Sequence, residues 1–239
     1  MSKCVSTKYY SFDHIKNQAK VTGSEALAYH LYLQLYEKAV QKDAPTILEL
    51  GTNKGLSTLM FLQAVKEKGG HVYSLDIEEQ YSDLTQSSDW TFICSDSTDV
   101  SGVLEQQPAL KEGIDILLID SLHKRSHVEK EFWGWEPYLK EGALIIFDDI
   151  DPTPYGPGAR KDNLSHEFDW HEIRQFVEEL FYANEDSLFL EMHFGSTGFA
   201  VMTKRTKMSQ RLNKHKPVRR RTDSVFWPFY IQARRSLRG

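Results

Sequence analysis

Residues 114–150, IDILLIDSLHKRSHVEKEFWGWEPYLKEGALIIFDDI, decide the fold of this chain. Two apolar runs, ILLID and ALIIFDD, are joined by a segment whose apolar residues recur at helical spacing. A near-continuous apolar run of this length is typical of a parallel strand that is covered on both faces. The stretch therefore predicts a strand, a helix and a second strand within one parallel sheet.

Carboxylates end both predicted strands. Asp120 closes the first, Asp148 and Asp149 close the second, and His123 follows shortly after Asp120. Ligands of an open α/β sheet bind outside the carboxyl ends of the strands, where these four side chains are expected to gather. Three carboxylates beside an imidazole that titrates near neutral pH indicate a hard-cation site with a general base. Asp148 and Asp149 can share an ion only if the strand has ended there, because adjacent strand residues point to opposite faces.

Two other interpretations of these residues stay open. Asp120 and Asp149 can simply cap the segments that follow them. His127 lies four residues after His123, and such a pair on a helix can bind zinc, although no third soft ligand is near in the sequence.

The stretch TILELGTNKGLSTLMFLQAVKEKGG precedes the central unit and predicts a strand at 46–50, a glycine-bearing turn at 51–55 and a helix at 56–68. This arrangement offers backbone N–H groups and a helix N-terminus to an anionic ligand. Asp76 ends the next apolar run, HVYSLDIE, and an acid at that place can accept hydrogen bonds from ribose hydroxyls.

The remaining patterns complete an α/β fold. A helix is expected at about 23–41, a third strand at 90–95, and a final antiparallel hairpin in SLFLEMHF and GFAVMTK. Residues 1–20 predict no regular element, and the Pro- and Gly-rich segment 151–169 predicts a long loop of the kind that covers active sites. We predict a Rossmann-like, doubly wound, mostly parallel seven-stranded sheet with an antiparallel C-terminal hairpin.

Composition and charge bound the organisation of the chain. It has 239 residues, 40% of them hydrophobic and 26% charged, which suits one soluble α/β domain with extensions. From Lys204 onward there are twelve Lys and Arg against one acid, whereas the chain as a whole has a net charge of −5. We therefore divide it into an N-terminal segment with a helix (1–45), an α/β domain (46–204) and a basic, aromatic tail (205–239).

The location and the redox state follow from what the sequence contains. The N-terminus lacks the apolar core of a signal peptide, and no apolar run approaches the length that spans a bilayer. We therefore expect a cytoplasmic protein. Cys94 lies in the apolar run WTFICSD and is expected to be a buried, reduced thiol.

The tail carries an aromatic cluster, Phe226, Trp227, Phe229 and Tyr230, flanked by arginines. Such a cluster can dock on a partner subunit, lie at a membrane surface as a peripheral contact, or bind nucleic acid. It can equally be an extension with one anchoring patch. Nucleic acid is the less favoured partner, because the acidic body would repel phosphates.

Taken together, ELGTNKGLST, the acid at Asp76 and the pair LLIDSLH and LKEGALIIFDDI resemble class I S-adenosylmethionine-dependent methyltransferases. The resemblance covers residues 46–204. It is nearest to the metal-dependent O-methyltransferase branch, and within it to the macrolide-sugar O-methyltransferase and cephalosporin-hydroxylase-like group. One departure is that Asn53 and Lys54 replace the additional glycine that many methyltransferases carry between Gly51 and Gly55; the metal-dependent branch often lacks it too.

The resemblance implies a role for each matching position. It assigns cofactor binding to Glu49, Gly51, Thr52, Asn53, Gly55, Ser57, Asp76, Asp96, Ser97 and Asp120. It assigns a Mg²⁺ ion to Asp120, Asp148 and Asp149, and the general base to His123. Ser57 is expected near the methionine carboxylate, and Asp96 with Ser97 on the adenine side.

The function implied is a Mg²⁺-assisted, S-adenosylmethionine-dependent O-methyltransferase that acts on a hydroxyl of a sugar-bearing metabolite or a glycan precursor. Hydroxylase-like or metal-independent chemistry on small molecules stays open, because a fold does not fix a reaction. A nucleic-acid methyltransferase steered by the tail is a further alternative. Relatives in this group are often oligomeric, so a homo-oligomer is expected.

Overall fold

The structure is a computed structural model that describes residues 11–21, 24–78, 87–153, 164–219 and 226. One sheet with the strand order β3-β2-β1-β4-β5-β7-β6 forms its centre. Its strands are β1 (Thr46–Leu50), β2 (His71–Asp76), β3 (Trp90–Cys94), β4 (Ile114–Ile119), β5 (Leu139–Asp148), β6 (Leu188–His193) and β7 (Phe199–Lys204). The first five strands of that order run parallel, and β7 is antiparallel to both β5 and β6. The predicted seven-stranded sheet with its antiparallel hairpin is confirmed.

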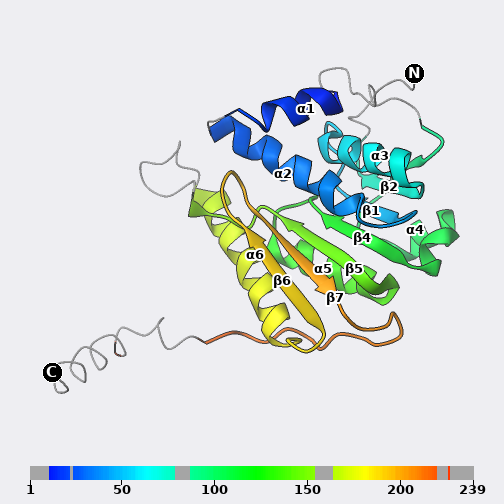
Figure 1. Ribbon diagram of the computed structural model, residues 1–239. Coiled ribbons are helices and arrows are strands. Elements are labelled where there is room, and N and C mark those ends of the chain that lie inside the picture. Colours follow the sequence, from blue (N-terminus) through cyan, green and yellow to red (C-terminus); the bar gives the residue numbers. More distant parts are fainter. Residues whose placement is uncertain (1–10, 22–23, 79–86, 154–163, 220–225, 227–239) are drawn as a thin grey trace.

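Helices cover both faces of the sheet (Figure 1). One face carries α1 (Phe12–Gln18), α2 (Ser24–Ala39) and α3 (Leu56–Lys68), and the other carries α4 (Val100–Gln106), α5 (Arg125–Trp135) and α6 (Leu164–Tyr182). Two short 3-10 helices, η1 (Pro108–Glu112) and η2 (Glu136–Tyr138), lead into β4 and β5. A separate buried apolar cluster fills each interface between the sheet and its helices, as expected for a doubly wound sheet.

Three local expectations were wrong. Helix α1 lies where no regular element was predicted: Ser11 caps it by accepting a hydrogen bond from the N–H of His14, and only Phe12 and Ile15 are buried, which is too weak a pattern to read. Helix α6 begins at Leu164, so the end of the expected long loop is helical, while residues 154–163 lie outside the described residues. Cys94 is exposed, because β3 is an edge strand of the sheet.

The first part of the basic tail packs against the body. The carboxylate of Glu136, which is fully buried, pairs with Arg211 and accepts the backbone N–H of Leu212 at 3.0 Å. The ring of His215 stacks on Trp133, and the ammonium of Lys214 lies 3.8 Å from the centre of the same ring. The segment from Arg211 to His215 is therefore held against η2, α5 and α6.

The remaining expectations for the tail rest on residues that are mostly not described. Of its aromatic cluster, Phe226 is described and is exposed, whereas Trp227, Phe229 and Tyr230 lie outside the described residues. Among the helices that the structure describes, none is long and apolar enough to cross a membrane.

Candidate functional site

The glycine turn after β1 packs directly on the backbone that follows β4. Gly51 has a φ of +94°, and a Cβ atom there would lie 2.2 Å from the carbonyl oxygen of Asp120. On the other side, the N–H of Asp120 donates a hydrogen bond to the carbonyl of Leu50 at 2.9 Å. A side chain at position 51 would separate these two segments, so glycine is required by space as well as by conformation.

Asp76, the acid expected to hold ribose hydroxyls, also holds the glycine turn. One of its carboxylate oxygens accepts the backbone N–H groups of Thr52 and Asn53, both at 2.9 Å. Asn53 has a φ of +42°, a left-handed conformation that asparagine tolerates. Two of the N–H groups expected to face an anionic ligand are thus already satisfied by the carboxylate next to the ligand space.

Glu49 and Ser57 lie behind the turn. Glu49 is fully buried and accepts hydrogen bonds from Thr58 at 2.6 Å and Ser74 at 2.5 Å. Burial raises the pKa of Glu49 to about 7, although hydrogen bonds from Ser57, Ser74 and Thr58 oppose the rise. Gly55 precedes α3 with a φ of +75°. These residues shape the turn from the side of α3 and β2.

A cavity of about 550 Å³ opens at the carboxyl ends of β1, β2, β3 and β4. Six of the residues that the resemblance assigned to the cofactor line it: Gly51, Asn53, Asp76, Asp96, Ser97 and Asp120. His123 and His127 also line it, together with the apolar side chains Leu75, Ile77 and Leu122. The other four, Glu49, Thr52, Gly55 and Ser57, are buried and do not line this cavity. Its volume suits a nucleoside-sized ligand.

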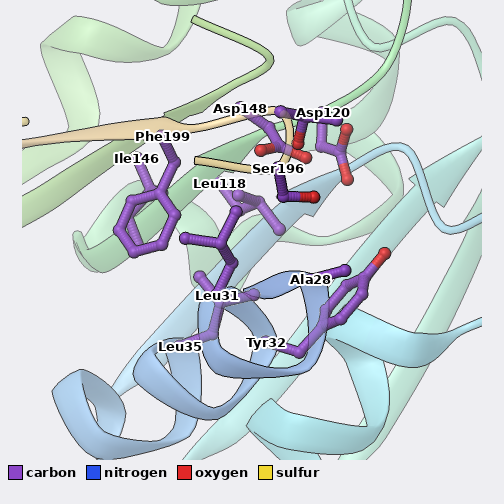
Figure 2. Close-up of a pocket in the computed structure, with 11 residues that line it drawn as sticks. Ala28, Leu31, Tyr32, Leu35, Leu118, Asp120, Ile146, Asp148, Ser196 and Phe199 are labelled. Atoms are coloured by element: carbon purple, nitrogen blue, oxygen red, sulfur yellow. The ribbon is translucent and has the colours of Figure 1, made fainter. Parts of the chain in front are cut away.

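The predicted acid cluster assembles beside this cavity. The register pairs Ile119 with Phe147, so that Asp120 and Asp148 follow side by side at the sheet edge, as Figure 2 shows. Asp149 has a φ of +55°, which turns the chain immediately after β5. That turn is the condition under which two consecutive acids can face one space, and it is met here.

His123 is held between two of the acids. Its Nε2 atom lies 3.2 Å from Asp120, and its Nδ1 atom lies 2.5 Å from Asp149. Burial alone would lower the pKa of His123, but the hydrogen bonds and charges of Asp120 and Asp149 outweigh burial and raise it to about 11. The expectation that His123 titrates near neutral pH is therefore wrong for this arrangement, in which the ring is a cation.

Burial raises the pKa of two of the acids, Asp120 and Asp148. The pKa of Asp120 rises because of burial, which the contact with His123 opposes. The pKa of Asp148 rises well above its usual range because of burial and the nearby charges of Asp120 and Asp149. Three carboxylates at one point repel one another, and the imidazolium ring of His123 is the counter-charge that touches two of them.

The donor set suits a hard divalent ion, but the present arrangement does not form a coordination shell. Asp120, Asp148 and Asp149 supply oxygen ligands, the type that Mg²⁺ prefers. However, the ring of His123 occupies the space between Asp120 and Asp149. In the described part of the chain, no three His, Cys, Asp or Glu side chains are grouped so that they could hold a metal ion. An ion could bind these acids only if His123 moved from between them.

The structure does not place His123 and His127 on one helix, as a zinc site formed by this pair would require. Helix α5 begins at Arg125, so His123 precedes the helix and does not share a helical face with His127. The Nε2 atom of His127 lies 3.3 Å from Glu131 instead.

Glu131 is a site residue that the sequence analysis missed. Its side chain is fully buried in α5, and one carboxylate oxygen accepts hydrogen bonds from Ser97 and Ser121, both at 2.5 Å, and lies next to His127. All three partners line the 550 Å³ cavity. A glutamate on the apolar stripe of a helix was the available signal, since a buried charge needs partners. Glu131 therefore fixes the cavity wall on the side of β3.

Comparison with known proteins supports the fold. Residues 48–150 match a family described as Methyltransferase domain. A methyltransferase of the mycinamycin biosynthetic pathway, solved in complex with Mg, SAH and mycinamycin VI, is 17% identical with a TM-score of 0.54, and the match covers 82% of this chain and 55% of that one. The present chain thus spans about half the length of that protein.

Two smaller enzymes are matched over more of their length. An O-methyltransferase from Bacillus cereus in complex with SAH is 20% identical with a TM-score of 0.53, with 73% of this chain and 80% of that one covered. The O-methyltransferase TomG from Streptomyces achromogenes, involved in tomaymycin synthesis and solved with SAM, is 15% identical with a TM-score of 0.53, with 80% and 89% covered. These likenesses confirm the fold that the resemblance to class I methyltransferases implied.

We predict that Gly51→Ala lowers the affinity for SAH more than Gly142→Ala does. The new methyl group would lie 2.2 Å from the Asp120 carbonyl oxygen and push the two segments apart. Gly142→Ala is the matched control, because Gly142 also has a positive φ, of +78°, but nothing lies within 4 Å of its Cβ position. Strain alone should cost both variants about 1–3 kcal/mol in urea unfolding. Only Gly51→Ala should also lose about tenfold or more in SAH affinity by calorimetry; equal SAH affinities in the two variants would contradict the account.

We predict that Glu131→Gln weakens SAH binding on the order of tenfold, since it removes the charged acceptor that orients Ser97, Ser121 and His127. Glu136→Gln is the matched control: Glu136 is equally buried near the end of the same helix but bonds Arg211 and Leu212, away from the cavity. S-ribosylhomocysteine, which lacks adenine, should bind the wild type and Glu131→Gln equally. A similar loss of SAH affinity in both glutamine variants would reduce Glu131 to a stability role.

Proposed function

We propose that this chain, whose residues 48–150 match a family described as Methyltransferase domain, transfers the methyl group of S-adenosylmethionine to a hydroxyl oxygen. One observation carries the proposal: the 550 Å³ cavity at the strand ends and the acid cluster with His123 meet at Asp120. The space for the cofactor and His123, a group that can move a proton, therefore lie next to each other. In the reaction, the hydroxyl oxygen bonds the methyl carbon, the carbon–sulfur bond breaks, and S-adenosylhomocysteine leaves.

The lining of the cavity supports the cofactor. Asp76 would accept the ribose hydroxyls, and Ser97 with Asp96 would lie at the adenine side. Gly51 and Asn53 line the cavity where the glycine turn approaches it, which suits the methionine portion. Leu75, Ile77 and Leu122 supply apolar surface for the adenine ring.

His123 is the residue that we assign to remove the hydroxyl proton. It borders the cavity and contacts Asp120 and Asp149. In the arrangement described it is protonated, so the role requires one of its two ion pairs to open when the acceptor binds. The freed nitrogen would first give its own proton to the departing carboxylate or to water and then accept the hydroxyl proton, while the remaining carboxylate fixes the orientation of the ring.

We further propose that a Mg²⁺ ion assists the reaction and is held by Asp120, Asp148 and Asp149. When bound, such an ion lowers the pKa of the acceptor hydroxyl and orients it. The oxygen donors and the repulsion between these acids, which a cation would relieve, support the ion, and the methyltransferase of the mycinamycin pathway was solved in complex with Mg. From the resemblance of the sequence, we also propose a hydroxyl of a sugar-bearing metabolite or glycan precursor as the acceptor and a homo-oligomer, and from the lack of a signal-peptide pattern a cytoplasmic enzyme.

We predict that His123→Gln lowers turnover about 10²- to 10⁴-fold, as expected for the loss of a general base. Release of SAH from S-adenosylmethionine in a panel of hydroxyl acceptors measures the rate. SAH affinity should change little, because the other cavity walls remain. His166→Gln, on the exposed side of α6, is the control and should keep full activity. Retained turnover in His123→Gln would remove the assigned role and leave the methyltransferase assignment standing.

We predict that protein treated with EDTA regains one Mg²⁺ site on titration and that Asp148→Asn removes it. Asp148 is placed in the acid cluster, whereas Asp115, at the start of β4, bonds Lys140 at the opposite end of the strand. Asp115→Asn is therefore the control and should keep the ion. If EDTA-treated protein turns over at the full rate and binds no Mg²⁺, the metal-independent alternative replaces this proposal.

A further inference from the structure

A second, smaller cavity lies on the other side of the acid cluster. Its volume is about 100 Å³, and it is enclosed by α2, the carboxyl ends of β4 and β5, and the turn before β7. It is lined by Ala28, Leu31, Tyr32, Leu35, Leu118, Asp120, Ile146, Asp148, Ser196, Thr197 and Phe199. Figure 2 shows these side chains.

The lining divides into an apolar end and a polar end. Leu31 and Leu35 from α2 face Ile146 and Phe199 from the sheet, with Leu118 between them. Asp120 and Asp148 stand together at the other end. A group that enters the apolar end leaves water for aliphatic and aromatic surface, which is favourable only if the group is itself apolar.

Asp120 lines both this cavity and the 550 Å³ cavity. The two spaces therefore share Asp120 as a wall. A hydroxyl held at Asp120 would have the methyl donor on one side and the carbon skeleton of its own molecule on the other. The small cavity is thus the place for the part of the acceptor next to the reacting oxygen.

Tyr32 adds a hydrogen-bond donor at the same place. Its ring is half-buried on α2, and its hydroxyl is directed to the end of the cavity where Asp120 lies (Figure 2). Burial and the charges of Asp120, Asp148 and Asp149 raise the pKa of Tyr32, so the hydroxyl stays protonated. Within the described residues this hydroxyl makes no hydrogen bond, which leaves it able to donate to an oxygen of the acceptor.

We infer that the small cavity receives an apolar group attached next to the reacting hydroxyl. The acceptor is then an alcohol or vicinal diol in which the carbons on one side carry no oxygen. This inference rests on the proposed methyl transfer and narrows its substrate class. An apolar cavity of about 150 Å³ holds benzene, so a space of about 100 Å³ admits a short alkyl group or one edge of a ring. The hydroxyls of a fully hydroxylated ring would lose water there without gaining partners.

Two six-membered rings test the inference on the full-length wild-type chain. cis-Cyclohexane-1,2-diol and myo-inositol both present a cis vicinal diol, and they differ in whether the rest of the ring is apolar. Binding of each to the SAH-saturated protein is measured by ligand-observed NMR. The cyclohexanediol should bind at least about tenfold more tightly than myo-inositol. Equal binding, or a preference for myo-inositol, overturns the inference.

A variant that fills the small cavity provides the second part of the test. Ala28→Phe places a ring at the α2 wall and should abolish the preference for the cyclohexanediol, while Glu37→Phe, on the exposed side of the same helix, should keep it. SAH affinity should stay unchanged in both. A preference that survives in Ala28→Phe overturns the assignment of this cavity, and if Ala28→Phe fails to fold, the wild-type comparison decides. Absence of SAH binding in the wild type is a different result, since it would contradict the proposed function itself.

Discussion

The contact between the glycine turn and the backbone after β4 is the constraint on which the site depends. The N–H of Asp120 bonds the carbonyl of Leu50 at 2.9 Å, and the absent side chain of Gly51 lets the two segments touch. Parallel pairing of β4 with both β1 and β5 brings these segments to one edge. The glycine turn borders the 550 Å³ cavity, and Asp120 borders both cavities. Because the two segments are in direct contact, a shift of one would shift the other.

Several buried acids lie around this unit, and Glu49, Glu131 and Asp149 each have a local partner. His123 neutralises part of the acid cluster, the hydroxyls of Thr58 and Ser74 hold Glu49, and two serines with His127 hold Glu131. A carboxylate in an apolar interior is stable only with such partners. The same pairing gives rigid walls, because a hydrogen-bonded serine or histidine keeps one rotamer. The cavity is thus shaped before any ligand enters.

The sequence predicted what depends on periodicity and strand ends, and it missed what depends on side-chain packing. The alternation of apolar runs and helical spacing is a local signal, so the sheet, its hairpin and the gathering of Asp120, Asp148 and Asp149 were predicted correctly. The protonated state of His123 depends on two ion pairs across space, one of them to a residue 26 positions away, which no spacing rule gives. Glu131 was hidden for the same reason, because two of its three partners, Ser97 and Ser121, follow other strands and only His127 lies on its own helix. Helix α1 buries too few residues to produce a readable pattern.

The antiparallel direction of β7 has a consequence for the basic tail. Phe199, at the start of β7, lies beside Asp148, whereas Lys204, at its end, lies at the opposite edge of the sheet. The strand rises about 3.3 Å per residue, so the tail leaves the domain about 17 Å from the acid cluster. The contacts of Arg211 and Leu212 with Glu136 then hold its first residues on the far side of α5 and α6. The cations Lys204, Arg205 and Arg211 are therefore fixed near the edge of the sheet opposite the acid cluster, beyond the screening length of about 8 Å in physiological salt, so they contribute little to the electric field at that cluster.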